Sequence, residues 1–384
     1  MHQKYKNIVG EVIGELFIQF LARIYNEIED CKIATFSTLK YLNSPKSAKF
    51  RTFFKAKSQL GFISIGNTFD NVIGKFPIGF IIWNSEERQE IFKQITFDVF
   101  DKKGLFIGEK TIINYDENNF INDWLKAEYD KINNKIGVLG FVANDFQNQK
   151  LVFITGKGRG HHETNITIKN LIEFSIYFCV RHVFEHTWLN HNDQFLYPND
   201  NWKKDVKFQN DCICFTLFFE KNQIKSSDGT NHWIPFTEQE VNAKEKFESN
   251  FMTQFIAGKL KIEQPTSTTL FGDETKVSLY DGKPKVFSEE AKAVFNAGRE
   301  LWKYYHSQEF PSHGGVAESR GGYNVNASFY DIRAHFQGRN EKGRMNAKSD
   351  DAEYSELIAA LRQSLKILAD KIKPKIYEFE FLKE

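Results

Sequence analysis

The chain has 384 residues, of which 41% are apolar and 26% charged, a balance typical of a globular protein of two or three domains. Its formal net charge of +1 excludes the strong overall basicity of many nucleic-acid-binding proteins. It has no apolar run long enough to span a bilayer and no signal peptide at its start, and its four cysteines lack metal-type spacing. These patterns predict a cytoplasmic protein with reduced, buried thiols and no membrane partner.

The first part of the chain, residues 1–113, predicts an α/β domain. Apolar residues at helical spacing predict a helix over residues 14–28, and a shorter amphipathic helix over residues 44–57 that begins near Pro45. Short apolar runs bounded by turn residues predict buried strands. The turn at residues 70–75 leaves no room for a crossover helix, so the strands on either side of it are expected to be antiparallel. The expected strands are residues 32–36, 61–65, 77–83, 94–100 and 105–112, the last two forming a hairpin around Gly104.

The rest of the chain predicts mostly helices. One strand pair is expected over residues 137–143 and 150–155. Thr237 and Glu240 match a capping box at the start of a helix, and Gly258 is a stop signal at the end of that helix. Residues 263–285 are rich in turn residues and predict an irregular connector, and the apolar run at residues 211–220 is ambiguous in type. The expected helices are residues 118–133, 167–188, 237–258, 288–306, 326–336 and 350–372.

The order helix, strand, helix, strand, strand around residues 31–84 resembles the second half of the catalytic domain of adenine-N6 DNA methyltransferases of the restriction–modification type. In that family the sheet is doubly wound, and an antiparallel hairpin follows the fifth strand. The resemblance covers residues 1–85, and WLNHNDQFLYPNDNW (residues 188–202) and NHWIPFT (residues 231–237) are similar to distal parts of such enzymes.

This resemblance implies a fold class and three regions. The fold is a partial Rossmann-like methyltransferase sheet with an antiparallel terminal hairpin, followed by a mostly helical DNA-recognition region. Residues 1–113 would be the C-terminal half of the catalytic domain, residues 114–262 the DNA- and target-recognition region, and residues 263–384 a helical C-terminal region.

Two motifs of the family are not found in this sequence. The family binds S-adenosylmethionine on a Gly-rich turn after its first strand, and performs its chemistry with an Asn/Asp-Pro-Pro-Tyr/Phe tetrapeptide after its fourth. The chain has no Pro-Pro dipeptide, and no Gly-rich strand–turn–helix precedes Cys31. The resemblance therefore implies the target-base and DNA-recognition portion of such an enzyme, inactive without an upstream half that binds most of the methyl donor. Because the strand at residues 32–36 would pair with the strand carrying the tetrapeptide, we expect an upstream methyltransferase half or a second copy of the chain at that edge.

Phe69 is the candidate for contact with the target base. In the family, an aromatic residue at the start of this hairpin stacks on the adenine that is swung out of the duplex, and stacking recovers part of the cost of unstacking. Phe76, on the other side of the turn, is the competing candidate. The alternative for Phe69 is a structural role in the core of the hairpin.

Double-stranded DNA is the expected partner of several basic and aromatic residues. Lysine and arginine neutralise phosphates, Gly338 and Gly343 let the backbone approach closely, and aromatic and amide side chains of the loop at residues 188–202 can wedge between bases or read adenine edges. The alternative for each cluster is an ordinary solvated face. The candidate contacts are Lys46, Lys49, Arg51, Lys157, Arg159, Tyr197, Trp202, Arg339 and Arg344.

Two further hypotheses compete with a methyltransferase fragment. One is a non-catalytic DNA-binding or specificity protein derived from such an enzyme. The other is a zinc hydrolase, because His182, Glu185 and His186 match the His-x-x-Glu-His pattern in which two histidines bind zinc and the glutamate activates water. Glu238 or Glu240 would supply the third ligand. The alternative for this motif is the polar side of an apolar helix.

Overall fold

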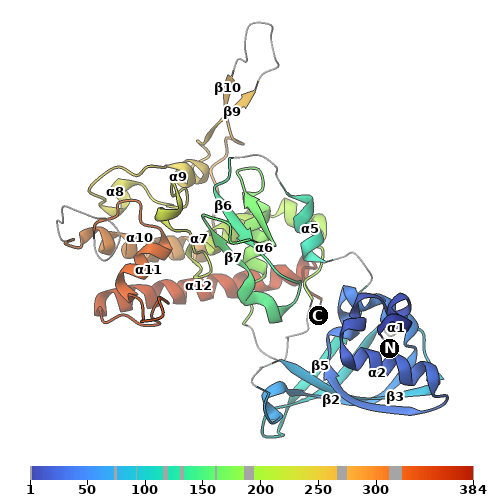
Figure 1. Cartoon of the computed structure of the whole chain (residues 1–384). Helices are drawn as coiled ribbons and strands as arrows, with labels where there is room; N and C mark the ends of the chain where they lie inside the picture. Colours follow the sequence, from blue (N-terminus) through green and yellow to red (C-terminus); the bar gives the residue numbers. More distant parts are fainter. Residues whose placement is uncertain are drawn as a thin grey trace.

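The computed structural model describes residues 2–72, 76–91, 93–115, 120–129, 134–160, 162–185, 194–265, 275–310 and 322–383. These residues form two separate hydrophobic cores. The first core lies within residues 5–112 and the second within residues 121–382. Figure 1 shows the first domain in blue to cyan and the second in green to red.

The first domain contains a five-stranded sheet of order β1-β3-β2-β4-β5. Strand β3 lies between β1 and β2 and is antiparallel to both, so β1 and β2 run parallel to each other. β2 pairs with β4 in parallel, and β4 and β5 form an antiparallel hairpin in which Gly104 has a φ of +77°. The five predicted strands and both predicted antiparallel pairs are confirmed. The strands are β1 (Lys32–Thr38), β2 (Ala56–Ile65), β3 (Pro77–Arg88), β4 (Gln94–Phe100) and β5 (Phe106–Ile113).

Helices cover one face of this sheet (Figure 1). Ile63, Ile81 and Trp83 are buried in the core of this domain. The helix predicted over residues 14–28 is confirmed as α2. The helix predicted over residues 44–57 is shorter than expected, because Phe54 is already extended and β2 begins two residues later. The helical segments are α1 (His2–Val9), η1 (Gly10–Gly14), α2 (Leu16–Glu27), α3 (Lys40–Asn43), η2 (Pro45–Ser47) and α4 (Ala48–Phe53).

The second domain is mainly helical around one small sheet. The sheet has three strands in the order β7-β6-β8, all antiparallel, which confirms the predicted strand pair and adds β8. Its strands are β6 (Gly137–Gly140), β7 (Phe153–Thr155) and β8 (Glu163–Ile166). Its helical segments are α5 (Ile121–Ala127), η4 (Phe146–Leu151), α6 (Leu171–Val180), η6 (Asp200–Lys204), α7 (Val206–Phe218), η7 (Ser226–Asp228), α8 (Glu238–Val241), α9 (Phe251–Ile256), α10 (Glu289–Ser307), α11 (Phe329–Gln337) and α12 (Ala352–Glu378).

Several predictions for this domain are wrong in extent. The helix expected over residues 167–188 ends at Val180. The helix expected over residues 237–258 is broken into two, because Asn242 adopts a φ of +55° and ends α8. Its capping box between Thr237 and Glu240 is present, and Gly258 ends α9 with a φ of +67°.

The connector predicted at residues 263–285 instead contains a β-hairpin. Strands β9 (Lys261–Pro265) and β10 (Thr275–Leu279) are antiparallel and project from the domain (Figure 1). One buried cluster includes both Phe255 and Phe287, on either side of this hairpin. The regions predicted at residues 114–262 and 263–384 therefore share a single core.

The four cysteines form no disulfide, and all but the half-buried Cys31 are buried. The prediction that the thiols are unpaired is confirmed. The prediction that all four cysteines are buried is wrong for Cys31. Within the ranges the structure describes, no helix has the length and apolar character needed to cross a membrane.

Candidate functional site

Phe69 lies directly after the short helix η3 (Gly66–Thr68), on the connection between β2 and β3. Its half-buried ring meets Phe36 of β1 edge to face, with 5.3 Å between ring centroids and 72° between planes. Phe76 is also half-buried, and its carbonyl accepts a hydrogen bond of 2.7 Å from the Gly66 amide. Phe69 therefore belongs to the sheet face opposite the helices.

That face carries a row of phenylalanines that crosses all five strands. Phe36 is paired with Phe80, Phe80 with Phe62, and Phe100 with Phe106. Neighbouring ring centroids are 4.8 to 6.0 Å apart. We call these residues the open aromatic face: Phe36, Phe62, Phe69, Phe80, Phe100 and Phe106.

No helix of the described chain packs on the open aromatic face. Phe36 is 50% exposed and Phe106 is 58% exposed. The neighbouring outward positions on β4 and β5 are Asp98 and Glu109, which are paired with each other in the strand register. Contiguous exposed apolar surfaces are typical of sites that contact other molecules, and Asp98 and Glu109 add negative charge to this face on β4 and β5.

The three basic residues of the first domain predicted to contact DNA differ in exposure. Lys46 and Lys49 are exposed. Arg51 is only 4% exposed, and its Nη1 donates to the carbonyls of Tyr41 and Ser44 at 3.1 and 2.8 Å. Its guanidinium therefore stabilises the turn between α3 and α4, and the prediction that Arg51 contacts DNA is corrected on that ground.

The two aromatic residues predicted to contact DNA also differ in exposure. Tyr197 is 43% exposed and stays a candidate. Trp202 is 3% exposed and packs edge to face on Trp124, with 5.6 Å between centroids. Trp202 is a core residue, so its predicted role in wedging DNA is wrong. Much of the loop at residues 188–202 lies outside the described residues.

Two basic turns that are far apart in the sequence lie on one surface of the second domain. Arg159 donates from Nη2 to Gln223 Oε1 at 2.8 Å. Lys225, two residues further along that segment, lies over the Tyr330 ring at 5.4 Å. Arg339 lies at 5.8 Å from the same ring and donates to the Tyr330 hydroxyl at 3.0 Å. Gln223, Lys225 and Tyr330 thus connect the turn of Arg159 to the turn of Arg339, a link that sequence patterns do not show.

Both turns are held by local hydrogen bonds. Gly343, with a φ of +70°, accepts at its carbonyl from Arg339 Nη1 at 2.9 Å, and Asn340 Oδ1 accepts from the Arg344 amide at 3.0 Å. In the other turn, the Glu163 carboxylate accepts from the Arg159 amide at 2.7 and 2.8 Å. Exposed cations on preformed turns can meet phosphates at little entropic cost. We call this set the basic surface: Lys157, Arg159, Lys225, Arg339, Lys342 and Arg344.

The His-x-x-Glu-His motif does not lie on one helix. His182 follows the last residue of α6 by two positions, and His186 lies outside the described residues. His182 is buried, and its Nε2 donates to the Val152 carbonyl at 3.0 Å. Burial lowers the pKa of His182 to about 3, so its ring is neutral near neutral pH. In the described ranges, no cluster of three or more His, Cys, Asp or Glu is arranged to hold a metal ion.

Comparisons with models of known protein families, with curated proteins and with solved structures find no match to this chain. The sheet topology and the two surfaces described above are therefore the features of this chain that bear on its function. The open aromatic face belongs to the first domain, and the basic surface belongs to the second.

Proposed function

We propose that the chain is the target-base and DNA-recognition portion of a site-specific adenine-N6 DNA methyltransferase, and that methyl transfer requires an upstream half. The observation that carries the proposal is the order of elements in the first sheet. Helix α2, strand β1, the α3–α4 segment, β2 and β3 follow one another, and β1 and β2 run parallel. A helical crossover between parallel strands, followed by an antiparallel hairpin, is what the resemblance to these enzymes implies.

The position of Phe69 agrees with a role in holding the target adenine. It lies at the start of the β2–β3 connection, where the resembling enzymes place the stacking aromatic, and contact with Phe36 orients its ring. An aromatic ring held in this way can recover stacking energy that an extruded base has lost.

The basic surface binds the phosphates of DNA in this proposal. Its cations come from three segments that are distant in the sequence, which explains how a chain with a net charge of +1 can present a local positive field. Affinity from such contacts falls steeply with salt, because each neutralised phosphate releases counterions.

The methyl donor is not assigned to residues of this chain. None of the strands in the described ranges is followed by a Gly-rich turn and then a helix, which is the arrangement expected to bind S-adenosylmethionine. β1 is at the end of its sheet and, among the described strands, pairs only with β3. An upstream half or a second copy that adds to β1 would complete the sheet and cover part of the open aromatic face.

Duplex-DNA binding, measured by fluorescence anisotropy at several salt concentrations, tests the recognition role. We expect the slope of log affinity against log salt to decrease by about 0.9 for each lost phosphate contact in Lys157→Gln and Arg344→Gln. Lys126→Gln, an exposed cation on α5 paired with Asp123, is the matched control and should leave the slope unchanged. Absence of binding at low salt, or an equal loss in the control, would contradict the proposal.

The second candidate is a DNA-binding protein without catalysis. It is favoured by the location of the basic surface, which lies entirely outside the sheet domain. An assay of methyl transfer to adenine, with the chain and the product of the upstream gene together, distinguishes the two candidate functions. Transfer that falls in Phe69→Ala while DNA affinity is kept supports the methyltransferase, and absence of transfer with every partner supports the second candidate.

A further inference from the structure

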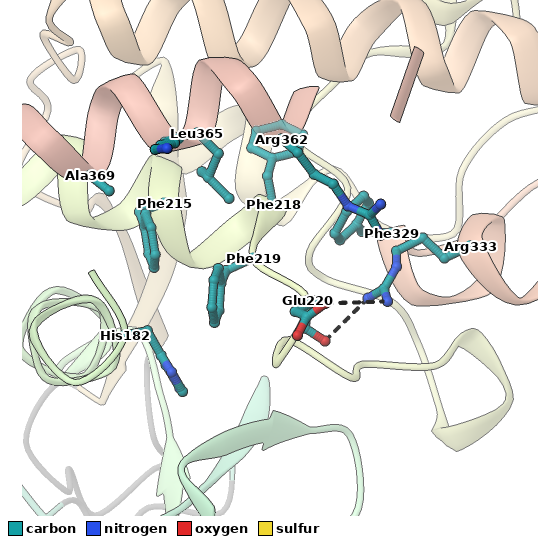
Figure 2. Close-up of a pocket in the computed structure, with 11 residues that line it drawn as sticks. His182, Phe215, Phe218, Phe219, Glu220, Phe329, Arg333, Arg362, Leu365 and Ala369 are labelled. Atoms are coloured by element: carbon teal, nitrogen blue, oxygen red, sulfur yellow. Dashed lines mark hydrogen bonds and ion pairs between the residues drawn. The ribbon is translucent and has the colours of Figure 1, made fainter. Parts of the chain in front are cut away.

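A pocket of about 240 Å³ lies in the second domain, where the end of α7 meets α11 and α12 (Figure 2). None of the DNA contacts predicted from the sequence lines it. Its floor is aromatic and its mouth is cationic.

The floor is a stack of uncharged rings. Phe219 stacks on Phe215, with 4.8 Å between centroids and 21° between planes, and its centroid is 4.7 Å from that of His182. His182 is held by the Val152 carbonyl, and burial lowers its pKa to about 3, so it adds no charge. Phe329 of α11 completes this apolar lining.

The mouth carries more positive than negative charge. Arg362 and Lys366 are one turn apart on α12, and neither forms a hydrogen bond or ion pair with any described residue. Arg333 is 8% exposed, donates to the Glu220 carbonyl at 3.2 Å, and has its Nη2 at 3.9 Å from the Glu220 carboxylate. The pocket lining therefore contains three cations and one carboxylate, and Figure 2 shows Glu220 against Arg333.

We propose that this pocket binds a nucleotide, with the base against the phenylalanines and the phosphate at Arg333, Arg362 and Lys366. The volume supports this division, because pockets that enclose a whole drug-sized ligand usually measure about 300 to 1,000 Å³. A smaller cavity admits one ring system and leaves the remainder of the ligand at the charged mouth. Arginine suits this position because its planar group can hold two phosphate oxygens at once.

The nucleotide can be free or part of a DNA strand. Arg333 lies three residues after Tyr330 on α11, and Tyr330 holds Arg339 and Lys225 of the basic surface. A strand that follows the basic surface therefore passes close to the mouth of the pocket, and one unstacked base could enter it. Only this DNA-borne source depends on the proposed function; binding of a free nucleotide does not.

The test uses the full chain and two probes. The first is 1,N6-etheno-AMP, followed by fluorescence anisotropy, with AMP and ribose 5-phosphate as competitors. The second is a labelled duplex with one adenine opposite an abasic site, compared with the fully paired duplex. Arg362→Glu and Lys366→Glu change exposed, unpaired side chains, so the fold should be kept. Lys126→Glu makes the same charge change outside both the pocket and the basic surface and is the matched control.

We expect the pocket variants to weaken etheno-AMP binding about tenfold or more, while Lys126→Glu changes it by less than about twofold. Ribose 5-phosphate, which has no base, should compete far more weakly than AMP. A different outcome is that the chain does not bind etheno-AMP and still prefers the duplex with the unpaired adenine. If that preference disappears in Arg362→Glu, the pocket is assigned to a base of DNA. The proposal is overturned if etheno-AMP does not bind and the pocket variants leave the duplex preference intact, or if the control weakens binding as much as they do.

Discussion

Replacing His182 with glutamine should remove part of the acid sensitivity of the chain. His182 is buried, and burial lowers its pKa from 6.5 to about 3. The unfolded chain takes up a proton on this histidine as the pH falls through 6.5, whereas the folded chain does so only near 3. Because the unfolded state binds more protons in that window, the free energy of unfolding decreases as the pH falls from about 6.5 towards 3.

The size of the effect follows from the two pKa values. At about pH 5 an ordinary histidine is almost fully protonated and His182 in the folded chain is almost fully neutral, so this residue costs roughly 2 kcal/mol of stability relative to about pH 7.5. Glutamine can still donate to the Val152 carbonyl, which His182 Nε2 contacts at 3.0 Å, and it does not titrate. The pH-dependent loss of stability in His182→Gln should therefore be smaller than in the wild-type chain by about 2 kcal/mol.

Urea unfolding at about pH 7.5 and pH 5, followed by circular dichroism, measures this difference with the wild-type chain as control. Burial also lowers the pKa of His306, to about 4, but that contribution is present in both chains and cancels. An equal loss of stability in the two chains would refute a buried, neutral His182.

Three further predictions concern the backbone and the surfaces. Arg51→Gln should destabilise the first domain by about 2 to 4 kcal/mol in urea unfolding and leave DNA affinity unchanged in the folded chain, whereas Lys49→Gln should cost less than about 0.5 kcal/mol. Gly258→Ala should cost more than about 2 kcal/mol, because a Cβ there would meet the Lys283 carbonyl carbon at 2.4 Å, while Gly343→Ala, with a similar positive φ and open space, should cost about 1 kcal/mol. Phe36→Ser on the half-exposed open aromatic face should weaken self-association in sedimentation velocity without lowering DNA affinity, and a fall in DNA affinity would place DNA on that face.

The strands of the first domain could be predicted from the sequence because each is short, apolar and bounded by turn residues. Their order in the sheet could not, since local patterns do not show that β3 inserts between β1 and β2. The broken helix after Thr237 was missed for a related reason. Apolar spacing continues past Asn242, and only its left-handed backbone shows that α8 ends there.

The candidate site was only partly predictable, because residue type does not determine exposure. Arginine and tryptophan are residue types that often contact DNA, yet Arg51 and Trp202 are both buried and stabilise the fold. Lys225 and Tyr330 gave no signal in the sequence, and their role depends on tertiary contacts with Arg339. The pocket was missed because its aromatic and charged residues come from the end of α6, from α7, α11 and α12.

The two surfaces of the molecule call for different partners. The open aromatic face offers phenylalanines bordered on β4 and β5 by Asp98 and Glu109, so a phosphate backbone laid across these two strands would meet carboxylates. A polypeptide can instead bury the rings and add a strand to the unpaired edge of β1, which gains both apolar burial and backbone hydrogen bonds. Phosphates are better placed on the second domain, where Arg339, Arg344 and Lys157 are exposed on preformed turns. We therefore expect protein association and phosphate contact to depend on separate domains, so that substitutions on one surface leave the other interaction intact, while the proposed contact with the target base is made by Phe69 of the first domain.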